Sequence, residues 1–155
     1  MHDSVTIYME APPEAVWDLI TDVTKIGEYS PETFEAEWLD GATGPMVGAR
    51  FRGHVRRNGK KMLTYWTTCK VVACKRPEDF AFTVMMGKRP SNTWSYHVDA
   101  RGTGTDVTES FRLADNLGNR LYWKLAGRRR GATNVKGMRQ TLERIKAVAE
   151  VPAQA

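Results

Sequence analysis

Alternating apolar and polar positions, the signature of a half-buried β-strand, recur along most of the chain. In residues 4–10, for example, Val5, Ile7 and Met9 share one face, with polar residues between them. Turn-forming residues rich in Gly, Pro, Asp and Asn separate these segments. Consecutive strands joined by short turns form an antiparallel sheet, so we expect about seven strands. They lie at residues 4–10, 33–40, 49–57, 62–75, 80–86, 93–100 and 106–114.

One turn carries a specific signal. Asn58-Gly59 lies between two strand-like segments. Both central residues of a type I′ turn need a positive φ, which Asn and Gly accept readily. We therefore predict a tight hairpin there. Residues 87–92 and 101–105 are also predicted as turns, from their glycines and Pro90.

Helical spacing appears after the first strand and at the end of the chain. Residues 13–21 begin at a proline and place Val16, Trp17 and Ile20 on one face, which predicts a short helix, and a second helical turn ends near Tyr29. Residues 120–149 follow i, i+3, i+4 spacing and predict a long helix. Three glycines interrupt this helix, namely Gly127, Gly131 and Gly137. We expect them either to bend the helix or to let another group approach its backbone closely.

The expected order of elements defines an α+β fold. A sheet with one apolar face needs a covering layer. The last helix is the only element long enough to supply it, at about 45 Å for 30 residues. A chain of 155 residues fits one domain, which we assign to residues 1–150 with a short tail at 151–155.

The order and spacing of these segments resemble the START-like or SRPBCC superfamily, in particular its polyketide cyclase/dehydrase-type members. The matching segments span about residues 4–148, in the order APPEAVWDLITD, YSPE, VGARFRG, YWTTCKVV, RPEDFAFTV, GTGTDVTESF and GMRQTLERIK. The chain is most similar to small stand-alone bacterial members. The resemblance implies a helix-grip (Bet v 1-like) fold with an internal cavity that binds lipids, polyketides, sterols or quinone-like molecules. It also implies that only a minority of members catalyse reactions.

The apolar faces of the strands supply a candidate cavity lining, although each of these side chains is also an ordinary core residue by type. The strand and helix residues expected to face inward are Phe34, Phe51, Gly53, Tyr65, Thr67, Cys69, Phe82, Met86, Trp94, Tyr96, Glu109, Phe111, Met138 and Leu142. The residues expected at the cavity mouth are Tyr29, Glu32 and Tyr122.

Glu109 is the least expected member of this set. Alternation places it between Val107 and Phe111 on the apolar face. A buried carboxylate is costly unless it is paired or protonated. We expect it either to face the cavity, as a ligand hydrogen-bond partner or a proton acceptor with a raised pKa, or to be turned outward by a β-bulge or paired with an arginine such as Arg57.

Other catalytic signals are weak. His54 and His97 fall on outward faces, which removes the easiest general base. We find no metal-ligand spacing and no nucleotide-binding or hydrolase motif, so we expect no metal and no cofactor. Cys69 and Cys74 are five residues apart on one predicted strand, hence on opposite faces and about 17 Å apart, too far for a disulfide.

Composition and charge refine the picture. Apolar residues make up 41% of the chain and charged residues 26%, which is typical of a globular protein. With no long apolar run, no secretory signal and no disulfide, we expect a soluble cytoplasmic protein. The net charge of +5 arises from residues 120–150, which hold nine Lys and Arg against two Glu.

This basic segment is open to three interpretations: a solvated helix face, contact with acidic groups of a ligand, or transient contact with an anionic membrane. The membrane contact would use Lys124, Arg128, Arg129 and Arg130. Nucleic-acid binding fits poorly, since there is no helix-turn-helix and no basic groove with interleaved aromatic residues.

Three functions therefore follow from the sequence and the resemblance. The first is a binding or carrier protein for an apolar or amphipathic small molecule. The second is a cyclase or dehydratase in which Glu109 acts as the base and Tyr65 or Tyr96 orients the substrate. The third is a protein-interaction or chaperone-cofactor module that uses the basic helix.

Overall fold

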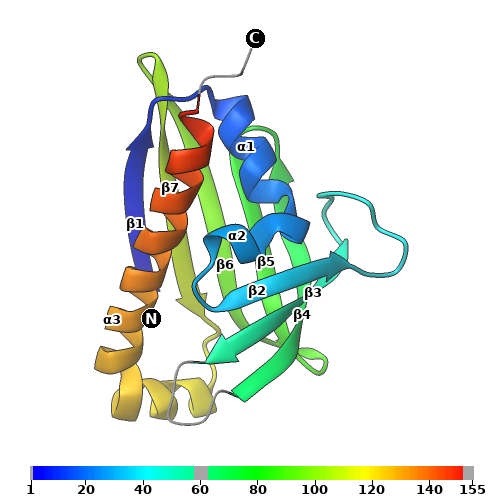
Figure 1. Ribbon diagram of the computed structural model, residues 1–155. Coiled ribbons are helices and arrows are strands. Elements are labelled where there is room, and N and C mark those ends of the chain that lie inside the picture. The colour runs from blue at the N-terminus through cyan, green and yellow to red at the C-terminus, as the bar shows by residue number, and fades with distance from the viewer. Residues whose placement is uncertain (1, 58–62, 152–155) are drawn as a thin grey trace.

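The computed structural model describes residues 2–57 and 63–151, without the side chains of Arg57, Tyr122, Ala126 and Arg128. Seven strands form one antiparallel sheet in the order β1-β7-β6-β5-β4-β3-β2 (Figure 1). Their bounds are β1 His2–Met9, β2 Thr33–Trp38, β3 Arg50–Arg57, β4 Leu63–Lys75, β5 Asp79–Met86, β6 Arg89–Arg101 and β7 Gly104–Leu113.

The helices occupy the positions that the periodicity predicts. Helix α1 spans Pro13–Thr21, a short 3-10 turn spans Val23–Lys25, and α2 spans Ile26–Tyr29. Helix α3 runs from Leu117 to Ala149 and lies over one face of the sheet, beside β1 and β7 (Figure 1). The predicted α+β fold, with a long C-terminal helix on a curved antiparallel sheet, is confirmed.

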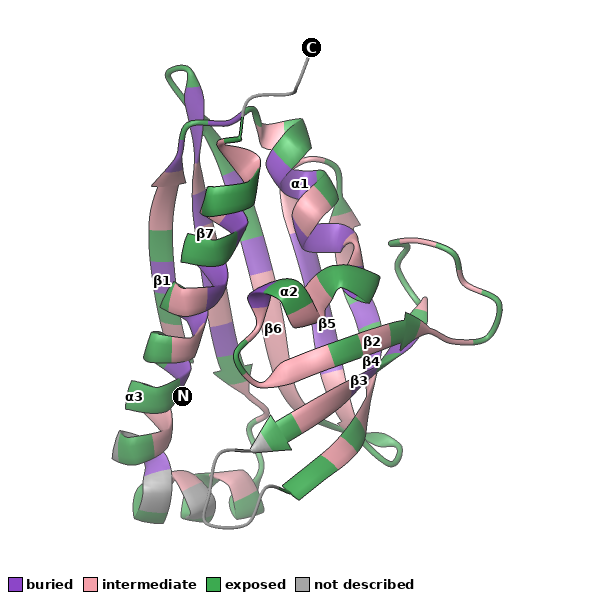
Figure 2. Cartoon of the chain, in the orientation of Figure 1, coloured by how far each residue is buried: buried purple, intermediate pink, exposed green. Residues whose placement is uncertain are grey.

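The hydrophobic core lies between the sheet and the helices, where purple buried positions alternate with pink and green ones along several strands (Figure 2). Trp17 of α1 contacts Phe80 edge to face, with ring centroids 6.2 Å apart. Met138, Leu142 and Ile145 of α3 are buried against the sheet. Val135, predicted on the same helix face, is exposed, and its neighbour Asn134 is buried instead.

Two strands start earlier than predicted. The segment 87–92 was expected to be a turn, but β6 already begins at Arg89, and β7 begins at Gly104. Gly87 and Gly102 have φ values of 62° and 59°, which two-residue turns need and which glycine adopts without strain. Pairing with the neighbouring strands extends the ladder into residues that composition alone assigns to turns. The predicted Asn58-Gly59 hairpin lies outside the described residues.

Irregular pairing in β2 places Phe34 on the outer face of the sheet, away from the helices. The register shifts between Thr33 and Glu35, so Phe34 is the extra residue of a β-bulge. Its ring lies on the outer surface, 4.3 Å from the His54 ring and below the Arg56 guanidinium. Strict alternation predicts that Phe34 points inward, and the bulge makes that prediction wrong.

A second irregularity, in β4, changes the relation between the two cysteines. The register of β4 shifts between Val71 and Ala73, so Cys74 pairs with Phe80, a core residue, and itself contacts the core. Cys69 and Cys74 therefore face the same side of the sheet, and the predicted opposite faces are wrong. Both thiols are free, as expected.

Helix α3 is bent, and Gly127 admits a close contact. The first turns of α3, yellow in Figure 1, run at an angle to the rest of the helix. At Gly127 a Cβ atom would lie 2.8 Å from the indole of Trp123, closer than real contacts allow. Because Gly127 has no side chain, Trp123 can fold back against the helix.

Two glycine substitutions test this packing in opposite directions. A Cβ on Gly27 would lie 2.0 Å from the backbone oxygen of Phe34, which cannot move aside, whereas one on Gly137 would meet only Pro31 at 3.7 Å. We expect Gly27→Ala to lower the free energy of unfolding by about 2 kcal/mol or more. Gly137→Ala should raise it by up to about 1 kcal/mol, because alanine favours helix. Thermal denaturation measures both, and similar stability changes for the two variants would contradict the prediction.

Candidate functional site

A cavity of ≈ 460 Å³ lies between the sheet and α3. Strands β3 to β7, the segment that leads into β2, and α3 between Asn119 and Thr141 all contribute to its walls. Of the side chains predicted to face inward or to stand at the mouth, the structure places these along it: Glu32, Phe51, Gly53, Tyr65, Thr67, Cys69, Phe82, Met86, Trp94, Tyr96, Glu109, Phe111 and Met138.

Four predicted residues do not belong to this lining as described. Phe34 lies on the outer surface because of the bulge in β2. Tyr29, predicted at the mouth, is buried in the core, and this burial raises the pKa of its hydroxyl. Leu142 is fully buried one turn beyond Met138, where α3 already meets the sheet. The side chain of Tyr122 lies outside the described residues.

Several residues of α3 line the cavity although the sequence gave little reason to expect them. Asn119, Trp123, Thr133 and Asn134 all contribute to its wall. Asn134 is buried to 3% exposure. Asn134 lies four residues before Met138, so helical spacing places both on the same face of α3. The sequence analysis missed it because only apolar residues were assigned to that face. Trp123 also reaches the cavity, from the angled first turns of α3, and no local pattern encodes that geometry.

The apolar part of the wall is built from aromatic pairs held by cross-strand neighbours. Phe51 on β3 and Phe82 on β5 meet edge to face with ring centroids 5.0 Å apart. Trp94 on β6 lies 4.9 Å from its cross-strand partner Phe111 on β7. Such contacts fix the ring positions, because edge-to-face pairs have a preferred geometry. The wall is therefore shaped before any ligand enters.

Glu109 is buried in this wall, at 4% exposure. The β6–β7 register is regular and pairs Glu109 with Tyr96, so the alternative of a bulge that turns it outward is wrong. The Tyr96 hydroxyl donates a hydrogen bond of 3.0 Å to Glu109 Oε1. The side chain of Arg57, the other alternative, lies outside the described residues.

Burial controls the protonation state of this pair. Loss of solvation raises the pKa of Glu109 from 4.5 to about 8, although the hydrogen bond from Tyr96 acts in the opposite direction. Burial first, and the proximity of Glu109 second, hold the pKa of Tyr96 well above its usual range. Both groups are therefore mainly neutral at pH 7. The site contains a carboxylic acid rather than a carboxylate.

Two polar atoms of cavity-lining residues lack hydrogen-bond partners among the described residues. They are Oε2 of Glu109 and Nδ2 of Asn134. A third buried atom without a partner, Oδ2 of Asp3 on β1, lies below α3 near Gly131. Native proteins leave few buried polar groups unsatisfied. Each of these three atoms has almost no exposure to solvent.

An ion pair joins α3 to the chain before β2 at the edge of the cavity. Arg130 donates two hydrogen bonds of 3.2 Å each to the two carboxylate oxygens of Glu32. The side chains are 20% and 32% exposed, so the pair stands where the cavity meets solvent. Because Glu32 neutralises Arg130, this arginine is not a free cation.

The remaining candidate groups are not positioned for catalysis or metal binding. Burial raises the pKa of Cys69 to about 12, so its thiol stays protonated and unreactive. His54 and His97 lie on the outer surface, as predicted, and contact Glu35 and Asp79. Among the described residues, no cluster of three or more His, Cys, Asp or Glu side chains could hold a metal ion.

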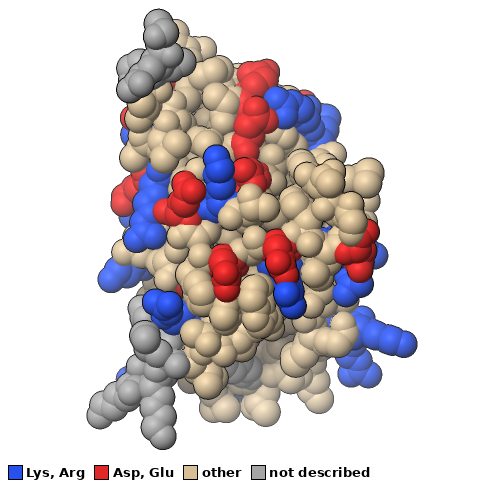
Figure 3. All heavy atoms as spheres, turned by 45° about the vertical axis from the view of Figure 1, so that its right-hand side comes forward, with Lys and Arg blue, Asp and Glu red and all other residues tan. Residues whose placement is uncertain are grey.

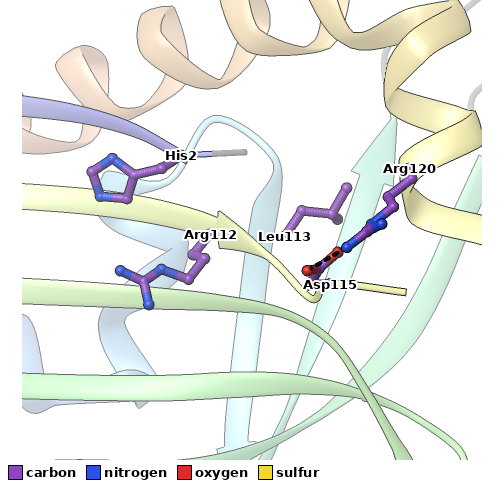
Figure 4. Close-up of a pocket in the computed structure, with 5 residues that line it drawn as sticks. All are labelled: His2, Arg112, Leu113, Asp115 and Arg120. Carbon is purple, nitrogen blue, oxygen red and sulfur yellow. Dashed lines mark hydrogen bonds and ion pairs between the residues drawn. The ribbon is translucent and has the colours of Figure 1, made fainter. Parts of the chain in front are cut away.

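A second hollow lies outside the sheet at the ends of β1 and β7 (Figure 4). It is open to solvent and lined by His2, Arg112, Leu113, Asp115 and Arg120. Arg120 donates hydrogen bonds of 2.6 and 2.9 Å to the two oxygens of Asp115, so these charges neutralise each other. This hollow offers no enclosed surface, and the cavity under α3 is the stronger site.

A curved antiparallel sheet closed by a C-terminal helix, with an aromatic-lined cavity between them, defines a helix-grip protein of the START-like or SRPBCC superfamily. The family model described as polyketide cyclase / dehydrase and lipid transport matches residues 2–150, and the chain belongs to that family. No curated protein sequence matches the chain. None of the helices in the described part of the chain has the length and apolar character to cross a membrane.

Solved structures agree with this assignment of the fold. The chain is similar to the Polyketide_cyc-like protein Cgl2372 from Corynebacterium glutamicum, with 27% identity over 97% of this chain and 91% of that one and a TM-score of 0.65. Major latex-like protein 151 from Panax ginseng shares 14% identity over 97% and 98% of the two chains, with a TM-score of 0.65. The di-domain ARO/CYC BexL of the BE-7585A biosynthetic pathway shares 17% over 99% of this chain and 51% of its own length, with a TM-score of 0.67.

The raised pKa of Glu109 predicts how stability depends on pH. Between about 4.5 and about 8 the unfolded chain ionises Glu109 while the folded protein keeps it protonated. The contribution of this residue to stability is therefore complete below about pH 4.5 and declines as pH rises to about 8. Glutamine has no such titration, so Glu109→Gln should be stabilised relative to wild type by a growing margin, reaching a few kcal/mol at pH 8.

Urea denaturation of wild type and Glu109→Gln at pH 5 and pH 8 measures this margin. Glu143→Gln on the exposed side of α3 is the matched control and should show a small, nearly constant difference. A margin for Glu109→Gln that is equal at both pH values would show that Glu109 titrates normally.

Proposed function

We propose that this protein binds and carries an apolar or amphipathic small molecule, such as a lipid, polyketide, sterol or quinone-like compound, in the cavity under α3. The observation that carries the proposal is the cavity volume of ≈ 460 Å³, within the range of about 300–1,000 Å³ typical of ligand pockets. The proposed ligand contacts are the predicted residues that line this cavity, together with Trp123 and Asn134.

The lining supports an apolar ligand. Aromatic side chains on the five strands β3 to β7 contribute to the wall, and the surface of the wall is more apolar than polar. Ligand sites commonly combine a mainly apolar surface with a small number of placed polar groups. The description of the family, which names polyketide cyclases, dehydrases and lipid transport, agrees with this class of ligand.

The cyclase or dehydratase alternative has weaker support from the site. That mechanism needs Glu109 as a base, but burial keeps most of this carboxyl protonated near pH 7. A carboxylic acid can donate a proton or a hydrogen bond, but it is not a base that removes a proton from a substrate. Tyr96 is already engaged with Glu109, and the raised pKa of its hydroxyl does not favour proton transfer. We therefore propose binding as the main function.

We also propose that the carrier contacts anionic membranes through the first turns of α3. Leu117, Leu121 and Leu125 are spaced four residues apart on one helix face and are 83%, 60% and 81% exposed. Lys124 and Arg129 on the same turns are exposed cations. Exposed leucines flanked by cations are typical of helices that lie in the lipid interface.

The location of this face suits ligand transfer. Asn119 and Trp123, from the same turns of α3, line the cavity, so the leucine face adjoins the ligand site. Elsewhere the surface is mixed: on the side shown in Figure 3, cationic and anionic side chains are interspersed.

We also propose that the protein is cytoplasmic, since its two free thiols fit a reducing compartment. Residues 1–150 are proposed to form one domain.

Filling the cavity tests the binding proposal. Thr67 on β4 faces the cavity, and the next residue, Thr68, pairs with Arg52 on the outer face. We expect Thr67→Trp to weaken binding of the apolar fluorophore N-phenyl-1-naphthylamine about 10-fold or more, because the indole occupies ligand volume. Thr68→Trp, the matched control, should bind as wild type does. Fluorescence titration measures both, and equal affinities would place the fluorophore outside the cavity.

Changing the leucine face tests the membrane proposal. Leu121→Ser with Leu125→Ser should reduce co-sedimentation with phosphatidylglycerol vesicles several-fold, because the apolar insertion is lost. Lys124→Glu should reduce it most at low salt. Val148→Ser, at the other end of α3, changes an exposed apolar residue and should have no effect. Undiminished vesicle binding by the double leucine variant would exclude this face as the contact.

A further inference from the structure

Trp123 has a placement that bears on which ligands fit, and the inference drawn from it rests on the proposed binding function. The residue belongs to the angled first turns of α3 (Figure 1), lines the cavity and packs against the hydrophobic core. It is partly buried rather than fully enclosed. Among the described residues of α3, it contributes the largest side chain to the cavity wall.

The indole of Trp123 lies flat against its own helix. A Cβ atom on Gly127 would lie 2.8 Å from each of three indole atoms, Cγ, Cδ1 and Nε1. Equal distances to three atoms of the five-membered ring mean that this ring lies face-on over Gly127. A Cβ atom on Gly131 would lie 3.8 Å from Cη2, at the far end of the six-membered ring. Gly127 and Gly131 therefore form a groove along α3, here called the glycine groove, in which the indole is seated.

The glycine groove faces the sheet. Gly127 is buried, and a Cβ atom on Gly131 would lie 3.5 Å from Oδ2 of Asp3 on β1. The indole is therefore held between α3 and the body of the protein. Because the same indole lines the cavity, a displacement away from the helix moves it into the space available to a ligand.

The size of an indole is substantial relative to this space. The cavity volume is ≈ 460 Å³, which corresponds to roughly 15 water-sized groups at about 30 Å³ each. Protein interiors are closely packed and tolerate little overlap. A bicyclic ring that lies on the helix, or instead extends into the cavity, therefore changes which ligands fit.

We propose that Trp123 is the residue that determines the upper size limit of the ligand, and that Gly127 and Gly131 keep its indole out of the cavity. The glycine groove holds the ring flat, so that this part of the wall stays close to the helix. A side chain at Gly127 brings the wall inward, and a smaller residue in place of Trp123 moves it outward. Size selection thus depends on one aromatic side chain and on the absence of side chains beneath it.

A series of straight-chain alkanols of increasing length measures the size limit. Each alkanol competes with N-phenyl-1-naphthylamine, and its affinity should rise about 4-fold for each added CH₂ group until the chain no longer fits. We expect Trp123→Ala to move this break to chains longer by about four carbons or more, although partial collapse of the wall reduces the gain. Gly127→Ala should move the break to chains about two carbons shorter, because the displaced indole occupies ligand space.

Coupling between the two positions separates size selection from a purely structural role. In a protein that already carries Trp123→Ala, Gly127→Ala should have no further effect, since the indole that it displaces is gone. Gly118→Ala is the matched control. It adds the same methyl group to α3 at an exposed position, 3.5 Å from Oδ1 of Asn116, and should keep the wild-type break. If Trp123 only stabilised the fold, its variants would lower all affinities by the same factor.

Trp123→Phe keeps a smaller ring and should give an intermediate break, so the inference stays testable if Trp123→Ala fails to fold. The same break in wild type, Trp123→Phe and Gly127→Ala would overturn size selection by Trp123 and leave the carrier function intact. The absence of any break in wild type would do the same. Failure of N-phenyl-1-naphthylamine to bind wild type would overturn both.

Discussion

Coverage of a curved sheet by a single helix is the constraint on which the rest of the structure depends. The apolar face of the seven strands must be removed from water, and α3 is the element that reaches along it. The C-terminal half of α3 meets the sheet closely through Met138, Leu142 and Ile145. Toward its N-terminus α3 instead contributes residues to the cavity wall, and its first turns run at an angle to the rest of the helix (Figure 1). Core and ligand site are therefore two ends of one interface.

This arrangement explains why a carboxyl group persists in an apolar wall. Glu109 occupies an inward position of a regular β-ladder, so it cannot reach solvent without breaking the pairing of β7 with β6 and β1. The protein accommodates it as a neutral acid, held by Tyr96 from the neighbouring strand. A neutral acid is buried at a smaller electrostatic cost than a carboxylate.

Local irregularities determine which side chains reach the site. The bulge in β2 turns Phe34 outward and leaves Thr33 at the cavity, and the shift in β4 brings Cys74 to the same side as Cys69. Both changes follow from one extra residue in a strand, which reverses the alternation beyond it. The ion pair between Glu32 and Arg130 then joins the bulged end of β2 to α3 across 98 residues of sequence.

The sequence by itself determined the order of elements, the α+β fold and most inward strand positions, including Glu109, because period-2 and helical spacing are local properties that burial enforces. It did not determine the outward position of Phe34 or the burial of Tyr29, and it did not indicate Asn134 and Trp123 as lining residues. Those depend on strand register and on the path of a bent helix, which arise only when distant segments pair. The protonation state of Glu109 also belongs to the tertiary structure, since it follows from the exclusion of water by residues of other elements.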